Sequence, residues 1–252
     1  MNRFMCIILG LLILGLGALW AQTGISSADL KTLVTQDSGY IKTALAKTNL
    51  EKDPKSQKKI RAATLMIAHY AQSGISKDNP KNAALATLRD SALAVRTAVK
   101  DGKFGDARKL AEKLALDAPV NEAVKIEPVA LGKLEDVDLV MKQFASARMG
   151  GFGLEDYLID LKDLKENPGA DDVEKIRTFA RKLSLIATLS AVQTPGELNN
   201  KKTQAKWELF AKDMDLSSTA LAKAAESKNA AEISKAAQKV SDTCVKCHDV
   251  YR

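Results

Sequence analysis

Apolar residues recur at three- and four-residue intervals along most of the chain, which is the spacing of one face of an α-helix. Ile60, Ala63, Ile67 and Ala71 mark such a face in one segment. The residues between the apolar positions are mainly alanine, lysine and glutamate, which favour helix, and runs of β-branched residues are absent. The pattern therefore predicts an all-α protein.

Proline and glycine divide this pattern into separate segments, because proline suits a first helical turn and glycine ends a helix. Pro54 and Gly74, for example, bracket one segment, and Gly150-Gly151-Phe152-Gly153 is expected to end another and turn the chain. Residues 118–133 contain two prolines and a glycine and are predicted to be a linker. The predicted helices span 27–47, 54–73, 80–100, 103–116, 134–149, 154–165, 171–192, 201–227 and 229 to the C-terminal motif.

The last ten residues carry distinctive chemistry, with the order Thr243-Cys244-Val245-Lys246-Cys247-His248-Asp249-Val250-Tyr251-Arg252. Cys-x-x-Cys-His is the attachment signature of a c-type haem. Cys244 and Cys247 lie one helical turn apart on the same face, so both thiols can add to the vinyl groups of one porphyrin. His248 is four residues from Cys244, and its imidazole can serve as the proximal ligand of the iron. The motif predicts one covalent haem c.

Two other uses of a Cys-x-x-Cys pair remain as alternatives. A structural zinc site needs four nitrogen or sulfur ligands, and the other candidates in the chain are Cys6 and the distant His69. His69 itself suits a half-buried position in a helix. A thioredoxin-like dithiol expects a βαβ setting, and no strand pattern surrounds this motif. We favour the haem over both.

Helical periodicity also predicts where the thiols point. The positions 233, 237, 240, 244, 247 and 251 form a single stripe in the last helix. Cys244 and Cys247 are therefore expected to point inward with the core face, which places a haem inside the helical bundle.

The two halves of the chain share a pattern, which suggests an internal repeat. Residues 105–114 align with residues 231–240 at nearly all charged and apolar positions, and Lys59-Ile60-Arg61 matches Lys175-Ile176-Arg177. The alignment places Ala118, Asn121 and Glu122 opposite the motif's thiols and histidine. Amphipathic helices rich in alanine and lysine also align by chance. We favour a duplication in which the first half carries no haem.

A four-helix unit with Cys-x-x-Cys-His at the end of its last helix resembles the class II c-type cytochromes, the cytochrome c-prime family. The tail Asp249-Val250-Tyr251-Arg252 fits this resemblance, which covers about 134–252 with a fainter echo over 27–117. The resemblance implies two tandem up-down four-helix bundles of this type after an N-terminal signal peptide. The expected parts are a signal peptide (1–21), a degenerate haem-less bundle (22–117), a linker (118–133) and a haem-binding bundle (134–252).

The same resemblance implies that the first helix of the haem bundle supplies the group on the distal side of the iron. Family members with a methionine there are six-coordinate electron carriers, whereas an apolar residue leaves a five-coordinate iron that binds small gases. Met141, in the predicted helix 134–149, is our candidate for the sixth ligand, with Met149 and Met214 as weaker candidates. The alternative is a core methionine that fills a gap.

The N-terminus has the features of a secretory signal peptide. Asn2 and Arg3 precede an apolar run from Met5 to Trp20, and a cut is predicted after Ala21. Leu19 is unusual for the position three residues before a cut, so an uncleaved anchor remains open. After cleavage no stable membrane span is expected, and Cys244 and Cys247 are the remaining cysteines, as suits an oxidising compartment. The sequence thus predicts a periplasmic or otherwise exported protein.

The net charge is +7, and it falls to +6 after cleavage because 37 Lys and Arg then face 31 Asp and Glu. This excess would help to steer an acidic redox partner protein toward the molecule. Solvated lysines on helix surfaces explain the excess equally well. No basic patch interleaved with aromatic residues points to nucleic acid. The resemblance also implies a homodimer.

Three functions are compatible with these features, and none is catalytic, because no catalytic constellation remains once the haem is built. The first is an exported electron carrier with one haem. The second is a five-coordinate module that binds nitric oxide or carbon monoxide. The third makes the haem-less half a docking module for a larger exported complex, which an exposed apolar patch on 27–117 would support.

Overall fold

In a computed structural model of the chain, the described residues are 25–121, 123–149, 151–193 and 201–251, and these contain nine α-helices and no strand. The predicted all-α class is confirmed. The predicted signal peptide, residues 1–21, lies outside the described residues. The helices are α1 (Ser27–Leu45), α2 (Pro54–Ser73), α3 (Asn82–Lys100), α4 (Phe104–Ala111), α5 (Val137–Met141), α6 (Leu154–Lys162), α7 (Ala170–Ala191), α8 (Lys201–Glu226) and α9 (Ala230–Tyr251).

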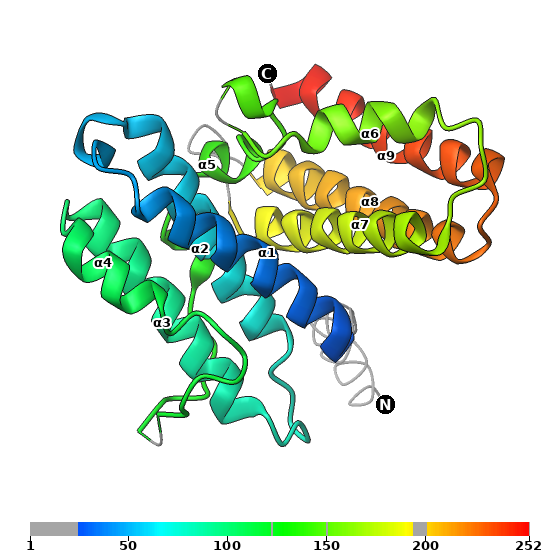
Figure 1. Cartoon of the computed structure of the whole chain (residues 1–252). Coiled ribbons are helices and arrows are strands. Elements are labelled where there is room, and N and C mark those ends of the chain that lie inside the picture. Colours follow the sequence, from blue (N-terminus) through cyan, green and yellow to red (C-terminus); the bar gives the residue numbers. More distant parts are fainter. Residues whose placement is uncertain (1–24, 122, 150, 194–200, 252) are drawn as a thin grey trace, which may run out of the picture.

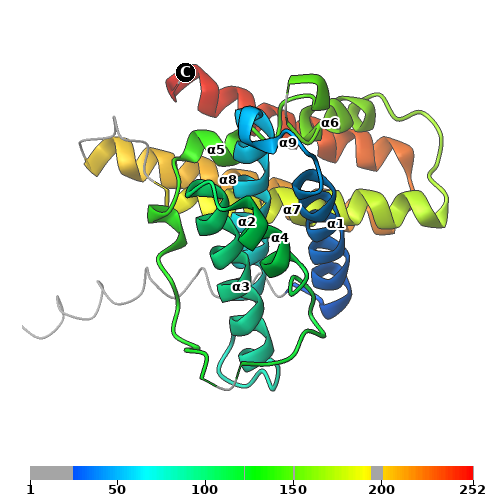
Figure 2. The same ribbon diagram turned by 60° about the vertical axis from the view of Figure 1, so that its left-hand side comes forward.

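The helices are arranged as two bundles whose axes are inclined to one another (Figures 1 and 2). In the N-terminal bundle, α1 to α4 each pack on the next helix and α1 also contacts α4. In the C-terminal bundle, α7 packs on α8, α8 on α9, and α9 on α6. None of the helices in the described ranges combines the length and apolarity that a membrane crossing requires.

Local sequence signals explain where the long helices begin and end. The Ser26 hydroxyl accepts a hydrogen bond from the Asp29 amide at 3.0 Å and so caps α1. The Asp53 carboxylate caps α2 in the same way through the Ser56 amide at 3.0 Å, with Pro54 in the first turn. Gly74 follows the last residue of α2, as predicted.

The predicted helix 134–149 is wrong. A 3₁₀ turn at Leu131–Lys133, the five-residue α5 and a second 3₁₀ turn at Ala147–Met149 take its place. The cause lies in the backbone after α5. The carbonyls of Gln143 and Phe144 accept from the amides of Phe152 and Glu155, at 2.9 and 3.0 Å, rather than from a continuing helix.

Two glycines make this turn possible. Gly153 has a φ of 72°, a conformation that favours glycine, immediately before α6. Gly151 lies so close to Ala145 that a Cβ would overlap the Ala145 carbonyl. The glycine-rich stretch therefore turns the chain as predicted, but the turn begins upstream, directly after α5.

The fourth helix is also shorter than predicted, since α4 ends at Ala111 instead of 116. The amides of Lys113 and Leu114 bond to carbonyls three residues back, at 3.0 and 3.1 Å, so the chain tightens into turns.

The predicted linker is held along α2 and α3 by a buried and a partly buried polar side chain. Arg89, which is 1% exposed, donates to the carbonyls of Lys125 and Glu127 at 2.7 and 2.8 Å. Gln72 accepts from the Val129 amide and donates to its carbonyl, at 2.8 and 3.0 Å. These bonds satisfy backbone groups that a sheet or helix would otherwise satisfy.

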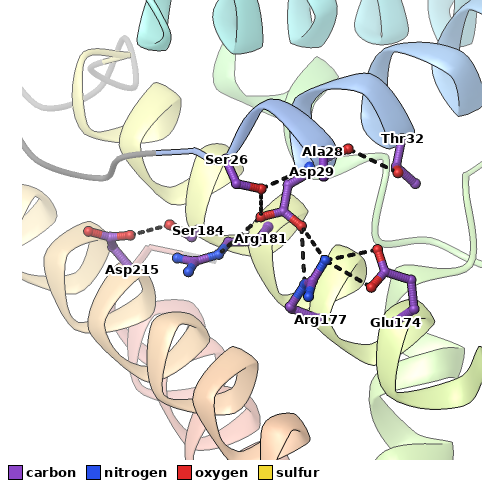
Figure 3. Close-up of polar contacts among 9 residues, drawn as sticks. All are labelled: Ser26, Ala28, Asp29, Thr32, Glu174, Arg177, Arg181, Ser184 and Asp215. Carbon is purple, nitrogen blue, oxygen red and sulfur yellow. Dashed lines mark hydrogen bonds and ion pairs between the residues drawn. The ribbon is translucent and has the colours of Figure 1, made fainter. Parts of the chain in front are cut away.

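Buried charges join the two bundles. The Asp29 carboxylate on α1 is contacted by Arg177 and Arg181 on α7, at 3.2 and 4.0 Å (Figure 3). Farther along α1, the Asp37 carboxylate accepts from Lys182 Nζ at 2.7 Å, and both side chains are almost fully buried.

Further polar contacts continue this junction. The Glu135 carboxylate, after the linker, pairs with Arg61 of α2 and with Arg96 of α3, the latter at 2.8 Å. His69 of α2 is half-buried, as expected, and its Nε2 lies 2.9 Å from Thr188 Oγ1 of α7. Burial lowers the pKa of His69 to about 4, so the ring is neutral at physiological pH.

Candidate functional site

The Cys-x-x-Cys-His motif occupies the last two turns of α9, on a helix whose inner face is well packed. Ile233, Ala237 and Val240 are buried, and Cys244 and Cys247 continue the same stripe in partly buried positions. The inward direction predicted for the two thiols therefore agrees with the structure of α9.

Two helices surround the motif. The first turn of α6 brings the Glu155 carboxylate near enough to Cys244 to act on its thiol, and α6 packs along α9. On the other side, the Tyr251 ring contacts those of Trp207 and Phe210 in α8, with centroid distances of 5.4 and 6.0 Å. The Tyr251 hydroxyl also donates to the Thr203 carbonyl at 2.8 Å. The end of α9 is thus anchored on α8.

The environment of the thiols favours uncharged sulfur. Burial, and then the charges of Cys247 and Glu155, raise the pKa of Cys244 to about 11. Burial raises the pKa of Cys247 to about 11 as well. Both groups are therefore neutral thiols at pH 7, and a neutral thioether suits these positions better than a thiolate would.

The imidazole of His248 is free to act as a ligand. The residue is exposed, and no polar partner for its ring occurs among the described residues. No group of three or more His, Cys, Asp or Glu side chains within the described ranges is arranged to hold a metal ion. The residues at the end of α9 thus fit a covalently held haem, with two neutral thiols inside and one unpaired imidazole beside them.

The three methionines considered as a sixth ligand lie on different elements. Met141 is the last residue of α5, and this short helix packs mainly on α2 and α7. Met214 is buried in α8, and Met149 is 72% exposed in the turn before α6. Sequence periodicity placed Met141 on a long helix of the C-terminal bundle, whereas the structure places it at the junction of the two bundles.

Sequence reasoning overlooked two residues near the motif. It used Tyr251 only as a position in the apolar stripe and as part of the family's tail, but the side chain ties α9 to α8. It assigned no role to Glu155, which the fold brings to Cys244 from 89 positions earlier in the chain. Tyr251 had a local signal in the sequence, because it is an aromatic residue at helical spacing. Glu155 had no such signal.

Comparison with known proteins gives one match. The family model of cytochrome C′ matches residues 170–252, a region that begins with α7 and includes α8 and α9 with the entire Cys-x-x-Cys-His motif. No curated protein and no solved structure shows significant similarity to the chain. The C-terminal region, residues 170–252, is therefore a cytochrome c′ domain, and such a domain implies a haem-containing c-type cytochrome.

Proposed function

We propose that the protein is an exported electron carrier with one haem c. Thioether bonds to Cys244 and Cys247 would hold the haem, and His248 would be the proximal ligand of the iron. Bound there, the haem supplies a one-electron ferric/ferrous couple. The observation that carries this proposal is the pair of inward, neutral thiols beside the unpaired imidazole on α9.

The protein's own residues would position the group. The last turns of α9 hold the two sulfur atoms and the imidazole at helical spacing, and the Tyr251 hydroxyl ties these turns to α8. The indole of Trp207, which donates to the Ser190 carbonyl at 2.8 Å, orders the adjoining part of α8. The positive net charge would favour an acidic redox partner.

The position of α5 favours a second candidate, a five-coordinate iron that binds nitric oxide or carbon monoxide. Met141 belongs to a helix that packs mainly on α2 and α7 rather than on α9. If this packing persists with haem bound, the thioether stays away from the iron and the distal side stays open. The two candidates share the same attachment and differ in the sixth ligand.

The N-terminal bundle supports a duplication. When the alignment of residues 105–114 with 231–240 is extended by one residue at its start, the buried positions of α4 and the turn after it coincide with those of α9. The coinciding pairs are Phe104 with Ala230, Ala107 with Ile233, Ala111 with Ala237, and Leu114 with Val240. We infer a haem-less copy, with the domain limits expected from the sequence.

A docking role for the N-terminal bundle has less support. The strongly exposed large apolar side chains among the described residues all lie at position 120 or beyond, so none falls in 27–117. Instead, α1 and α2 pack against α7 of the C-terminal bundle. We therefore propose that this half chiefly supports the cytochrome domain.

Attachment is tested by the intact mass of the full chain, produced with a working c-type haem attachment system. The mature protein should weigh one haem more than the chain cut after Ala21, and should be found in the exported fraction. Cys244→Ser/Cys247→Ser should lose the covalent haem, whereas Lys246→Gln, between the two thiols, should keep it. A haem mass that persists without both thiols would refute the assignment.

The sixth ligand is tested by optical spectra of the ferric and ferrous protein with and without carbon monoxide. Sharp bands that carbon monoxide does not change would indicate six coordination, and Met141→Ala should then convert the spectrum while Met149→Ala, at an exposed site, should not. A spectrum that shifts with carbon monoxide would favour the gas-binding candidate. Absence of haem absorbance would contradict both.

A further inference from the structure

A pocket of about 260 Å³ lies between the first turns of α2 and the end of α5, away from the motif on α9. Lys55, Lys58 and Lys59 reach it from α2, and Lys142 reaches it from the residue after α5. No acidic side chain lines the pocket. The described residues contain no carboxylate paired with any of these four ammonium groups. Positive charge is thus gathered here without a counter-charge.

Lys59 shows how little of this charge is compensated. Its Nζ lies 4.4 Å from the centre of the Phe152 ring and 4.8 Å from that of Tyr40, so aromatic faces are its contacts. Burial, and then the charges of Lys47 and Lys182, lower the pKa of Lys59. Lys182 is itself paired with the Asp37 carboxylate at 2.7 Å. Lys59, in contrast, forms no ion pair with a carboxylate of the described residues.

An independent feature of the same pocket is a buried amide without a partner. Gln143 lines the pocket and is 1% exposed, and neither its Nε2 nor its Oε1 has a hydrogen-bond partner among the described residues. Buried polar groups are normally paired, so this amide has unused hydrogen-bonding capacity directly behind the pocket wall. The amide nitrogen can donate to an anionic oxygen.

The rest of the lining is apolar and includes Ala62, Leu139 and Phe152. A bare inorganic anion would leave this apolar surface exposed to water, whereas the apolar part of an organic anion would cover it. The volume lies slightly below the usual range for ligand sites, which limits the occupant to a small molecule. We propose that the pocket binds a small organic anion, a carboxylate on a short apolar body.

The carboxylate lies against the lysine ammonium groups, and the apolar body covers Leu139 and Phe152. The Gln143 amide is covered in this structure, so its side chain turns toward the pocket to donate to the carboxylate. Lysine is a point charge that attracts any anion, so selectivity comes from the amide and the apolar wall. The pocket is separate from the haem attachment site, because neither the thiols nor His248 line it, although Met149, a weaker candidate for the sixth ligand, does.

The test uses octanoate as the probe on the haem-loaded full chain, by titration calorimetry and by NMR of side-chain amides. Octanoate should bind once per chain and shift the Gln143 amide signal. Lys55→Gln/Lys58→Gln/Lys142→Gln should weaken binding at least about tenfold. The control Lys77→Gln/Lys100→Gln/Lys109→Gln removes the same charge at exposed sites elsewhere and should leave the affinity unchanged.

Other outcomes would overturn the proposal. Equal weakening by the control triple variant would mean general charge attraction. Equally tight binding of octylamine would mean a merely apolar surface, and equally tight binding of inorganic phosphate would mean an unselective anion site. An unshifted Gln143 signal in the unmodified protein, which does not depend on any variant folding, would place octanoate outside the pocket.

Discussion

Asp37→Asn is the substitution that most directly tests how the two bundles are held together. The Asp37 carboxylate is 2% exposed and accepts hydrogen bonds from Lys182 Nζ at 2.7 Å and from the Tyr70 hydroxyl at 3.0 Å. Asparagine has nearly the same shape, so the change removes charge without opening a cavity. Breaking a buried ion pair by removing one partner costs about 3–5 kcal/mol. The free energy of unfolding should fall by that amount.

The reason is the lysine that remains. Lys182 is 6% exposed, and the asparagine side chain of Asp37→Asn would offer it only a neutral acceptor; its other favourable contact among the described residues is the Phe152 ring at 4.8 Å. Removing both charges in Asp37→Asn/Lys182→Met leaves no uncompensated ion, and such replacements are often close to neutral. The double variant should therefore be more stable than Asp37→Asn, with a coupling energy of at least about 2 kcal/mol.

The assay is urea unfolding at pH 7, followed by circular dichroism and by haem absorbance. Lys175→Gln is the matched control, because its 3.0 Å pair with Asp172 is solvent-exposed and should contribute less than about 1 kcal/mol. We also expect the two probes to give one transition, since buried bonds join the bundles. A loss below about 1 kcal/mol for Asp37→Asn, or additive losses in the double variant, would refute the reasoning.

Four further predictions concern individual residues. Because burial lowers the pKa of His69 from 6.5 to about 4, the unfolded chain binds more protons in this interval. Stability should then decrease by at most about 3 kcal/mol as pH falls from 6.5 to 4, and urea titrations of His69→Gln should lack this part of the dependence. Gly151→Ala should cost about 1–3 kcal/mol, because its Cβ would overlap the Ala145 carbonyl. By contrast, Gly39→Ala within α1, where a Cβ meets nothing within 4 Å, should raise the melting temperature through a gain of about 0.5–1 kcal/mol. Tyr251→Phe should lower stability by about 1 kcal/mol by thermal unfolding, since it removes one hydrogen bond but keeps the ring contacts; no change would show that the hydroxyl does not anchor α9.

Helix positions were predictable wherever the signals were local. Caps such as Ser26 and Asp53, a first-turn proline and the spacing of apolar residues all act within one or two turns, and they placed the longest helices to within a few residues. The predicted helix 134–149 failed for a different reason. Its carbonyls bond to amides beyond Gly151, and the apolar periodicity of 137–149 is equally compatible with a turn that packs on another bundle.

The features of the candidate site also divide into those set by local sequence and those set by tertiary packing. The sequence by itself determined the covalent chemistry that we propose, because the thiols of Cys244 and Cys247 and the imidazole of His248 are spaced along one helix, and that spacing does not depend on other elements. Only the tertiary structure decided what lies around them. Tyr251 contacts α8, Met141 packs toward the other bundle, and Asp37 meets Lys182 across 145 positions. Such pairings depend on how whole helices pack, and no residue's neighbours in the sequence specify them.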